Sequence, residues 1–345
     1  MVESSVTTPT ARPTSPETLI DTFGRQHRSL RISLTDKCQL RCTYCMPAEG
    51  MPWIPSTHIL TADEIVRVAR VLYLAGVTEF RITGGEPLIR PDAPEIIARL
   101  RALEEPGRPL DLALTTNAVL LERLAPTLKD AGLDRVNVSL DTLRPERFTQ
   151  LTLRNRFDQV LAGLRAASEA GLSPIKINTL LMPGINDDEV LDLAEFCVEQ
   201  GYELRFIEQM PLGEHRWDPA EIITQQQILD TLATRYELSE VPNRGSAPAA
   251  KWYLNGGPAT VGVIASVTQP FCAECDRLRL TADGQVRNCL FSDEEVDLRG
   301  PLRDGADDAT ILGLVRKSVM AKEAGHLIGR AGFNLPKRNM SGIGG

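Results

Sequence analysis

Six short apolar segments alternate with longer amphipathic stretches between residues 29 and 207. The apolar segments are Leu30–Leu34, Val77–Ile82, Leu110–Leu114, Arg135–Leu140, Pro174–Leu180 and Glu203–Ile207. Their length and composition predict β-strands, and the stretches between them predict α-helices. Parallel strands need crossover helices, so six strand-then-helix units predict a parallel sheet. A closed barrel of this kind has eight units, and we therefore expect an α/β fold with an incomplete (β/α)6 TIM-type barrel.

Turn and capping signals mark where several predicted elements end. A helix near 62–75 begins with Thr61 and Glu64, which have the spacing of a capping box, and a glycine follows it. A second helix, near 187–200, is also followed by a glycine. The capping and turn residues therefore predict the same helices as the alternation of apolar and amphipathic segments.

The periodicity weakens between Gly213 and Ala250, and we place a domain boundary near residue 215. Beyond it, Asp283-Gly284 is a turn signal that predicts a hairpin returning the chain toward Cys272. The strands expected in this part are Lys251–Leu254, Val261–Val267 and Arg277–Leu280, with a helix near 309–321. We expect a disordered tail over 1–28, the barrel over 29–215 and a C-terminal α+β domain over 216–345.

Six of the seven cysteines form two triplets. They are Cys38-x3-Cys42-x2-Cys45, directly after the first predicted strand, and Cys272-x2-Cys275-x13-Cys289, near the end of the chain. A closed structural zinc site normally has four protein ligands. An iron–sulfur cube held by three thiolates has one iron that is free to bind a small molecule. The triplets therefore favour two clusters with an open position, and a zinc site is the alternative for each. Cys197 lies in a helical pattern, where a core position is expected.

Composition excludes several other classes of protein. The 345 residues are 42% hydrophobic and 24% charged, with a net charge of −8, which is unfavourable for nonspecific nucleic-acid binding. No run of 18 apolar residues and no secretory signal is present, so we expect a cytoplasmic protein with no membrane partner. Clustered cysteines in a chain of this length indicate metal ligands in a reducing compartment rather than disulfides.

Polar and glycine residues gather where the predicted strands end. In barrels of parallel strands the chemistry takes place at this edge. The residues that follow this rule, besides the first triplet, are Gly84, Gly85, Glu86, Thr115, Thr116, Asn117, Ser139, Asp141 and Met210, while Lys176 and Arg205 lie within the fifth and sixth strands. We therefore expect these side chains to meet at one site. Histidine is too scarce, at four residues, to favour histidine acid–base catalysis.

Five segments together resemble one family of enzymes. They are Leu30–Cys38, Cys42–Pro47, Phe80–Pro87, Phe271–Leu280 and the terminal Gly344-Gly345. In this order they are similar to the GTP 3′,8-cyclases, which are radical S-adenosylmethionine (SAM) enzymes and catalyse the first step of molybdenum cofactor biosynthesis. The similarity extends from about Asp21 to Gly345, and the fold of this family is also an open barrel.

The resemblance implies two 4Fe–4S clusters and a role for each site residue. Cys38, Cys42 and Cys45 would hold a cluster that binds SAM, and Cys272, Cys275 and Cys289 would hold one that binds the guanine of GTP. The SAM contacts would be Tyr44, Gly84, Gly85, Glu86, Ser139 and Met210. The GTP contacts would be Arg31, Arg81, Thr115, Lys176, Arg277, Leu278 and Arg279, to which we add Arg205 because of its place at the barrel mouth. Gly344 and Gly345 would reach the active site and assist catalysis.

The reaction that the resemblance implies is a radical cyclisation of GTP. Reductive cleavage of SAM gives a 5′-deoxyadenosyl radical, which removes hydrogen from C3′ of the ribose. The carbon radical then attacks C8 of guanine to give 3′,8-cyclo-7,8-dihydro-GTP. The partners implied are GTP, a low-potential flavodoxin or ferredoxin, the downstream cyclic pyranopterin monophosphate synthase and a second copy of the chain in a homodimer.

Two alternatives differ in chemistry or class. A radical SAM maturase acting on a peptide would have more C-terminal cysteines and a peptide-binding extension, neither of which is evident. A zinc-stabilised binding module would contain zinc alone.

The sequence also departs from the family pattern at four positions. A basic residue is common at the position of Glu79, glycine at that of Ala118, an aromatic residue at that of Gln209 and asparagine at that of Asp276.

Overall fold

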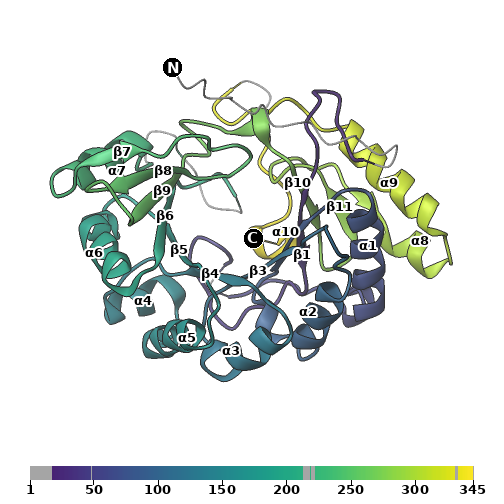
Figure 1. Ribbon diagram of the computed structural model, residues 1–345, viewed down its shortest axis with the longest axis horizontal. Helices are drawn as coiled ribbons and strands as arrows, with labels where there is room; N and C mark the ends of the chain where they lie inside the picture. The colour runs from purple at the N-terminus through teal and green to yellow at the C-terminus, as the bar shows by residue number, and fades with distance from the viewer. Residues whose placement is uncertain (1–17, 48, 213–217, 219–221, 331–332, 345) are drawn as a thin grey trace, which may run out of the picture.

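The structure is a computed structural model that describes residues 18–47, 49–212, 218, 222–330 and 333–344. Within these residues the strands form one 12-stranded sheet, in the order β12-β11-β10-β1-β2-β3-β4-β5-β6-β9-β8-β7. The middle of this sheet, from β10 to β9, is parallel throughout. Figure 1 shows these strands curving around the centre of the molecule, with helices outside them.

The six predicted strand-then-helix units are confirmed. The strands are β1 (Ser29–Ser33), β2 (Glu79–Thr83), β3 (Asp111–Thr116), β4 (Arg135–Ser139), β5 (Ile175–Leu180) and β6 (Glu203–Ile207). The helices are α1 (Ala62–Leu74), α2 (Ala93–Arg101), α3 (Leu121–Asp130), α4 (Pro145–Thr152), α5 (Phe157–Glu169) and α6 (Val190–Gln200), with short 3-10 turns η1 (Ser56–His58), η2 (Pro87–Ile89) and η3 (Asp187–Glu189). The capping box of Thr61 and Glu64 is formed at the start of α1. The open-barrel fold is therefore the one expected.

The C-terminal segment lengthens the same sheet at both of its edges. Its elements are α7 (Gln225–Ala233), β7 (Leu238–Glu240), β8 (Ala250–Leu254), β9 (Thr260–Ile264), η5 (Cys272–Glu274), β10 (Arg277–Leu280), β11 (Gln285–Arg287), β12 (Val296–Asp297), α8 (Arg299–Arg303), α9 (Asp308–Met320) and α10 (Met340–Ile343). Strand β9 is the parallel neighbour of β6, and β10 is the parallel neighbour of β1. The cysteines on either side of β10 and β11 are thereby placed beside the barrel mouth.

The hairpin predicted at Asp283-Gly284 is confirmed. Strands β10 and β11 are antiparallel, with Arg279 opposite Arg287, and Gly284 adopts the left-handed backbone that the turn needs (φ +82°). The predicted domain boundary near 215 lies outside the described residues and stays a prediction.

Residues 18–28, which we expected in a disordered tail, are instead packed against the rest of the protein. Leu19 is buried in the core, and Ile20 pairs with Gln26 in an isolated antiparallel bridge. Arg25 donates hydrogen bonds to the carbonyl oxygens of Cys272 and Glu323. The composition of the first residues gave no sign of these long-range contacts. Residues 1–17 lie outside the described residues.

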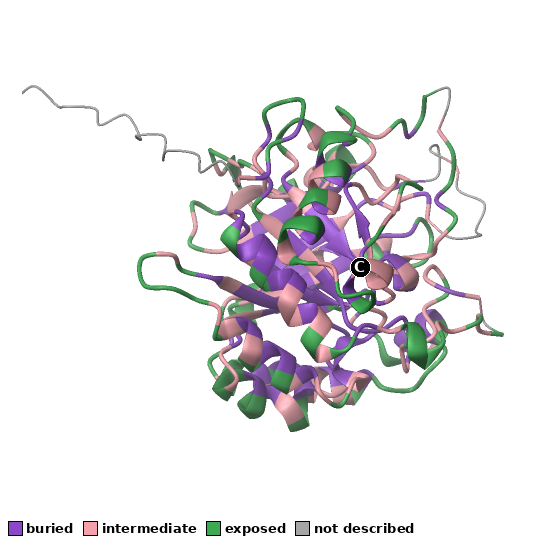
Figure 2. Cartoon of the chain, turned by 90° about the vertical axis from the view of Figure 1, so that its right-hand side faces the viewer, coloured by how far each residue is buried: buried purple, intermediate pink, exposed green. Residues whose placement is uncertain are grey.

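The hydrophobic core lies between the sheet and the helices that surround it. Figure 2 shows that the buried residues gather on the strands and on the inner faces of the helices, while the outer faces of the helices are exposed. Cys197 is buried in this core on α6, as expected. Within the described residues, no helix is both long enough and apolar enough to cross a bilayer.

Candidate active site

A cavity of about 350 Å³ opens at the carboxyl ends of the parallel strands. Loops from β1 to β6 contribute to its wall, and so do β10, the segment after β11 and the C-terminal residues Met340 and Ser341. The cysteines of both triplets line it, namely Cys38, Cys42, Cys45, Cys272, Cys275 and Cys289. Two triplets that are more than 220 residues apart in sequence therefore face one space.

Two glycines after β2 hold the loop that carries the first triplet. The backbone N–H of Gly85 donates to the carbonyl oxygen of Thr35 at 2.7 Å, and that of Glu86 donates to Lys37 at 2.7 Å. A Cβ atom on Gly85 would lie 2.4 Å from the Lys37 oxygen, and one on Gly84 would lie 2.5 Å from the Thr35 oxygen. Only glycine permits this approach, and both glycines line the cavity.

Glu86 lies behind the cavity wall rather than in it. Its carboxylate accepts hydrogen bonds from the Leu88 and Asn117 backbones and from the Thr116 hydroxyl. Asn117 in turn donates from its side chain to the Cys38 sulfur at 3.6 Å. Burial raises the pKa of Glu86 to about 7, and those three hydrogen bonds oppose the shift. Glu86 thus joins the loops after β2 and β3, and its contact with SAM stays a prediction.

The remaining predicted SAM contacts do line the cavity. Tyr44, Ser139 and Met210 are all part of its wall. The Tyr44 hydroxyl donates to the Asp141 carboxylate at 2.6 Å. Burial raises the pKa of Asp141 to about 6, although the hydrogen bonds from Tyr44 and from the backbone of Leu180 favour its ionised form. This pair fixes the loop of the first triplet to the end of β4.

The two triplets have different electrostatic surroundings. Burial raises the pKa of Cys38 to about 11 and that of Cys45 to about 12. Burial would also raise the pKa of Cys275, but Arg277 and Lys322 outweigh it and lower that pKa to about 7. Metal binding needs deprotonated thiols, so the neighbouring cations favour the metal-binding form of Cys275, whereas burial raises the pKa of Cys272 as it does in the first triplet.

Arginine side chains form a continuous row across three neighbouring strands. Arg279 on β10 lies in register with Arg31 on β1, and Arg31 lies in register with Arg81 on β2. Residues in register on parallel strands share a face, and here that face lines the cavity together with Arg277 and Arg205. Burial lowers the pKa of Arg31, Arg81 and Arg279, and the neighbouring arginines lower it further.

These arginines are short of negative partners. Among the described residues, Arg205 pairs with Glu203 at 3.7 Å, and the other four arginines form no ion pair with a carboxylate within 4.0 Å. Buried nitrogen atoms of Arg81, Arg205 and Arg277 also have no hydrogen-bond partner. Adjacent like charges destabilise a sheet, and unpaired buried charges are costly. The cavity is therefore built to receive an anion with several negative charges.

Two predicted GTP contacts do not reach the cavity with their side chains. Lys176 lies two residues nearer the start of β5 than Asn178, which lines the cavity, and it pairs with Glu203 at 3.5 Å. Leu278 is fully buried in the core, on the face of β10 opposite Arg277 and Arg279. Successive side chains of a strand point to opposite faces of the sheet, so Leu278 points away from the cavity when Arg277 and Arg279 point toward it. Thr115 does line the cavity.

The C-terminal helix α10 carries the end of the chain into the barrel mouth. Gly344 is buried, and its carbonyl oxygen accepts a hydrogen bond from Arg279 at 2.6 Å. A Cβ atom there would lie 2.8 Å from the Cβ of Ser33, and the backbone is left-handed (φ +88°). Glycine is therefore required by conformation and by space. Gly345 lies outside the described residues, and its role stays a prediction.

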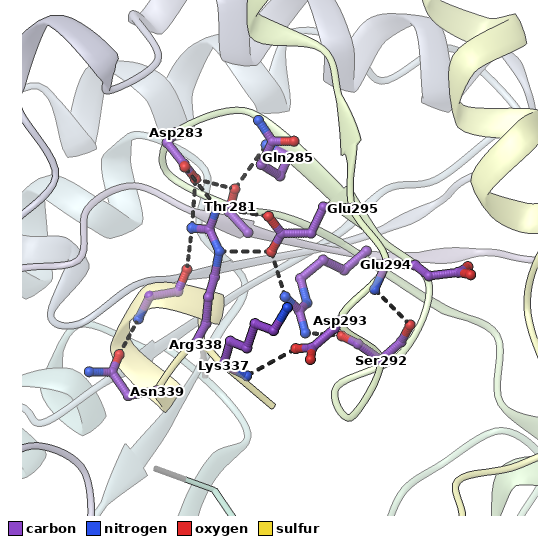
Figure 3. A network of polar contacts seen from close by, with 12 residues as sticks. Thr281, Asp283, Gln285, Ser292, Asp293, Glu294, Glu295, Lys337, Arg338 and Asn339 are labelled. Atoms are coloured by element: carbon purple, nitrogen blue, oxygen red, sulfur yellow. Dashed lines mark hydrogen bonds and ion pairs between the residues drawn. The ribbon is translucent and has the colours of Figure 1, made fainter. Parts of the chain in front are cut away.

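An ion-pair network holds this tail to the β10–β11 hairpin (Figure 3). Arg338 binds the Asp283 carboxylate at 2.9 and 3.0 Å and the Glu295 carboxylate at 2.7 and 2.8 Å. Arg287 also binds Glu295, and the Lys337 backbone donates to Asp293 at 2.9 Å. The hairpin that bears Arg277 and Arg279 thus also sets the position of the tail.

Comparison with known proteins identifies the family. Residues 32–197 match the Radical SAM superfamily, and residues 202–328 match Molybdenum Cofactor Synthesis C. A GTP 3′,8-cyclase of Streptomyces coelicolor is 55% identical over 331 residues, which cover 95% of this chain and 96% of that protein. One of Mycobacterium sp. (strain KMS) is 50% identical over 99% of this chain and 97% of that protein. The chain belongs to the GTP 3′,8-cyclase family.

Solved structures with lower identity show the same fold. Streptococcus suis SuiB bound to S-adenosylmethionine has a TM-score of 0.55 and 16% identity, over 85% of this chain and 68% of that one. SuiB bound to its precursor peptide SuiA gives 0.57 at 16% identity, over the same shares. As a radical SAM enzyme of the GTP 3′,8-cyclase family, this protein uses SAM and 4Fe–4S clusters.

The cysteines of each triplet are the residues that would hold the clusters that this family uses. Among the described residues, no three His, Cys, Asp or Glu side chains form a group able to bind one metal ion. Thiolates that hold a cluster bind different irons and do not have to converge on one point. Each triplet also gathers at one part of the cavity wall, where Cys45 hydrogen-bonds back to Cys42 and Cys275 to Cys272.

The departures from the family pattern lie at different distances from the cavity. Ala118 has a left-handed backbone (φ +63°), which explains why glycine is common there. Gln209 lines the cavity, whereas Glu79 and Asp276 do not. Burial raises the pKa of Glu79, and Asp276 and Asp111 raise it further.

Three further residues of the site escaped the sequence analysis. The residues are Arg25, Lys322 and Arg338, and the contacts that bring them to the site are made with residues 43 or more positions away. No local pattern signals such contacts. Each of the three connects a cysteine loop or the C-terminal tail to another part of the chain, so only the folded arrangement reveals them.

Proposed function

We propose that this protein converts GTP to 3′,8-cyclo-7,8-dihydro-GTP, the first step of molybdenum cofactor biosynthesis, within the cavity between its two cysteine triplets. The observation that carries this proposal is the row Arg279, Arg31 and Arg81, which lies in register in the same cavity as both triplets. Arg277 and Arg205 complete the set. Family membership supports the same substrate.

The arginine row fits a triphosphate. Guanidinium groups pair with phosphate oxygens in a bidentate manner, and such charge-assisted bonds are among the strongest hydrogen bonds in proteins. The neighbouring arginines repel one another, and burial penalises their charges. A triphosphate would replace this repulsion by attraction. Relief of the repulsion between the arginines would therefore add to the free energy of GTP binding.

Each end of the cavity has a distinct task in this proposal. Cys38, Cys42 and Cys45 would hold the cluster that supplies the electron for reductive cleavage of SAM and so the 5′-deoxyadenosyl radical. Gly85 and Tyr44 would hold SAM beside it. Elsewhere in the same cavity wall, Cys272, Cys275 and Cys289 would hold the cluster that orients the guanine.

The tail closes the substrate side of the cavity. The bond from Arg279 to the Gly344 carbonyl connects the end of the chain to a proposed phosphate ligand. A substrate bound there would be shielded from water, which matters because a radical intermediate must not be quenched. Lys176, Leu278, Glu86 and Gly345 stay predicted contacts, with support from the family pattern only.

We further propose the partners that this reaction needs. The first cluster requires a strong one-electron donor, for which a flavodoxin or ferredoxin is suited. The cyclised nucleotide must be rearranged by a cyclic pyranopterin monophosphate synthase. Seven free cysteines support a reducing compartment such as the cytoplasm, and family membership supports a homodimer.

Anaerobic metal analysis and a product assay test this function. The purified protein should contain about eight irons and a similar amount of sulfide, because each of the two cubes has four. With GTP, SAM and a chemical reductant, it should form 3′,8-cyclo-7,8-dihydro-GTP. Zinc without iron would contradict the proposal, and so would SAM cleavage that requires a peptide substrate.

A pair of cysteine variants separates the second triplet from a general effect of cysteine loss. Cys289→Ala should lose the second cluster and the cyclised product, while retaining some SAM cleavage. Cys197→Ala, in the core of α6 and away from the cavity, should retain both clusters and the product. Efficient product formation by Cys289→Ala would show that the second triplet is structural.

A further inference from the structure

Lys322 lies behind the second cysteine triplet, just after α9, and is 5% exposed. Its Nζ donates to the Cys275 sulfur at 3.4 Å and to the Arg277 carbonyl oxygen at 3.0 Å. In the described part of the chain it forms no ion pair with Asp or Glu within 4.0 Å. The anionic group that it contacts is therefore a cysteine sulfur.

The N-terminal segment brings one carboxylate and one arginine into the region of the second triplet. The buried carboxylate of Asp21 is already engaged: its Oδ2 contacts Arg25 at 2.6 Å and His27 at 3.2 Å, and its Oδ1 accepts hydrogen bonds from the backbone N–H groups of Phe23 and Arg25. Arg25 adds a further positive charge nearby and binds the Cys272 carbonyl oxygen. The Cys275 sulfur is therefore the negative group in hydrogen-bonding contact with Lys322.

A buried ammonium group without a counter-charge is strongly disfavoured. Three thiolates bound to a cube of four irons provide that counter-charge, because together they exceed the positive charge of the oxidised cube by one unit. Hydrogen bonds to the sulfurs and local net charge are also what set the potential of such clusters. Lys322, which is buried and bonded to the Cys275 sulfur, contributes both effects.

We infer that Lys322 is the charge partner of the second cluster: it stabilises the reduced form, raises the reduction potential and fixes the Cys275 ligand to the start of β10. The inference rests on the proposed function, because it takes Cys272, Cys275 and Cys289 as cluster ligands. Lys322 is a positioning residue, since it acts through Cys275 and does not line the cavity. Through the Arg277 carbonyl it also fixes the strand that bears two of the proposed phosphate ligands.

The test is a redox titration of the second cluster, followed by electron paramagnetic resonance. The full-length chain carries Cys42→Ala, so that the first cluster does not contribute. Lys322→Met should reduce the equilibrium constant for cluster reduction at least tenfold, which corresponds to about 59 mV for one electron. Lys322→Arg, which keeps the charge, should recover most of this loss. Lys317→Met, an exposed lysine on α9, should change nothing.

Each outcome decides the inference. A change smaller than twofold in Lys322→Met, with iron content intact, would overturn it and leave the proposed function standing. If Lys322→Met does not retain its cluster, the same measurement on Lys322→Gln, which keeps a hydrogen-bond donor without the charge, must show a lowered potential. Absence of any cluster from the Cys42→Ala parent would refute the ligand assignment, and the inference would fail with it.

Discussion

Replacing Arg277 by alanine tests the substrate side of the cavity most directly. Arg277 is the first residue of β10, lines the cavity and stacks on Phe271, with 4.5 Å from its guanidinium carbon to the ring centroid. One of its guanidinium nitrogens is buried without a hydrogen-bond partner. Within the described residues it has no carboxylate to pair with, so its charge is available to a phosphate group.

The expected loss follows from this arrangement. Truncating one member of a buried, hydrogen-bonded charge pair costs about 2–5 kcal/mol of binding free energy. Arg277 shares the anion with other arginines and is not fully buried, so the lower end of the range, about 2 kcal/mol, applies. At ~1.4 kcal/mol per factor of ten, GTP affinity should fall roughly thirtyfold. Iron content should not change, because the arginine is not a metal ligand.

Anaerobic titration calorimetry with GTP and with guanosine measures the effect. The matched control is Arg244→Ala, because Arg244 also stacks on Phe271, at 4.9 Å, but uses its donors on the carbonyl oxygens of Ala247 and Pro248. The control should lose at most a few-fold in affinity. A similarly small loss in Arg277→Ala, or an equal loss with guanosine, would refute the placement of the phosphates on this strand.

Three other variants test the remaining parts of the site. Cys42→Ala should abolish 5′-deoxyadenosine formation and halve the iron content, and deoxyadenosine production at the parental rate would contradict the first cluster assignment. Gly85→Ala places a Cβ atom 2.4 Å from the Lys37 oxygen, so SAM binding should fall at least tenfold in equilibrium dialysis; unchanged binding would show that the two loops can separate freely. Arg338→Ala should release the tail, which hydrogen exchange near Gly344 would detect, and should lower the yield of cyclised product per deoxyadenosine at least fivefold; an unchanged yield would show that the network does not position the tail.

Sequence reasoning located the barrel and most of the cavity wall for a local physical reason. Strand and helix periods, caps and turn residues act over a few positions, so the six barrel strands and the hairpin at Asp283-Gly284 could be predicted. The strand-end rule then placed Gly85, Ser139 and Met210 at one edge. It did not separate side chains that point into the cavity from those that only lie near it, as Lys176 and Leu278 show.

What the sequence alone determined is therefore the identity of the chemistry: two cysteine triplets, a glycine-rich segment after β2 and a set of arginines, whose order along the chain is typical of one family. The tertiary structure decided which of these groups meet. It aligned Arg279, Arg31 and Arg81, although β10 lies about 245 residues beyond β1 in the chain, and it placed Lys322 against Cys275 and Arg338 against the hairpin. Sheet register and buried charge pairing are long-range properties that depend on the whole packed chain, and no local pattern of residues contains them.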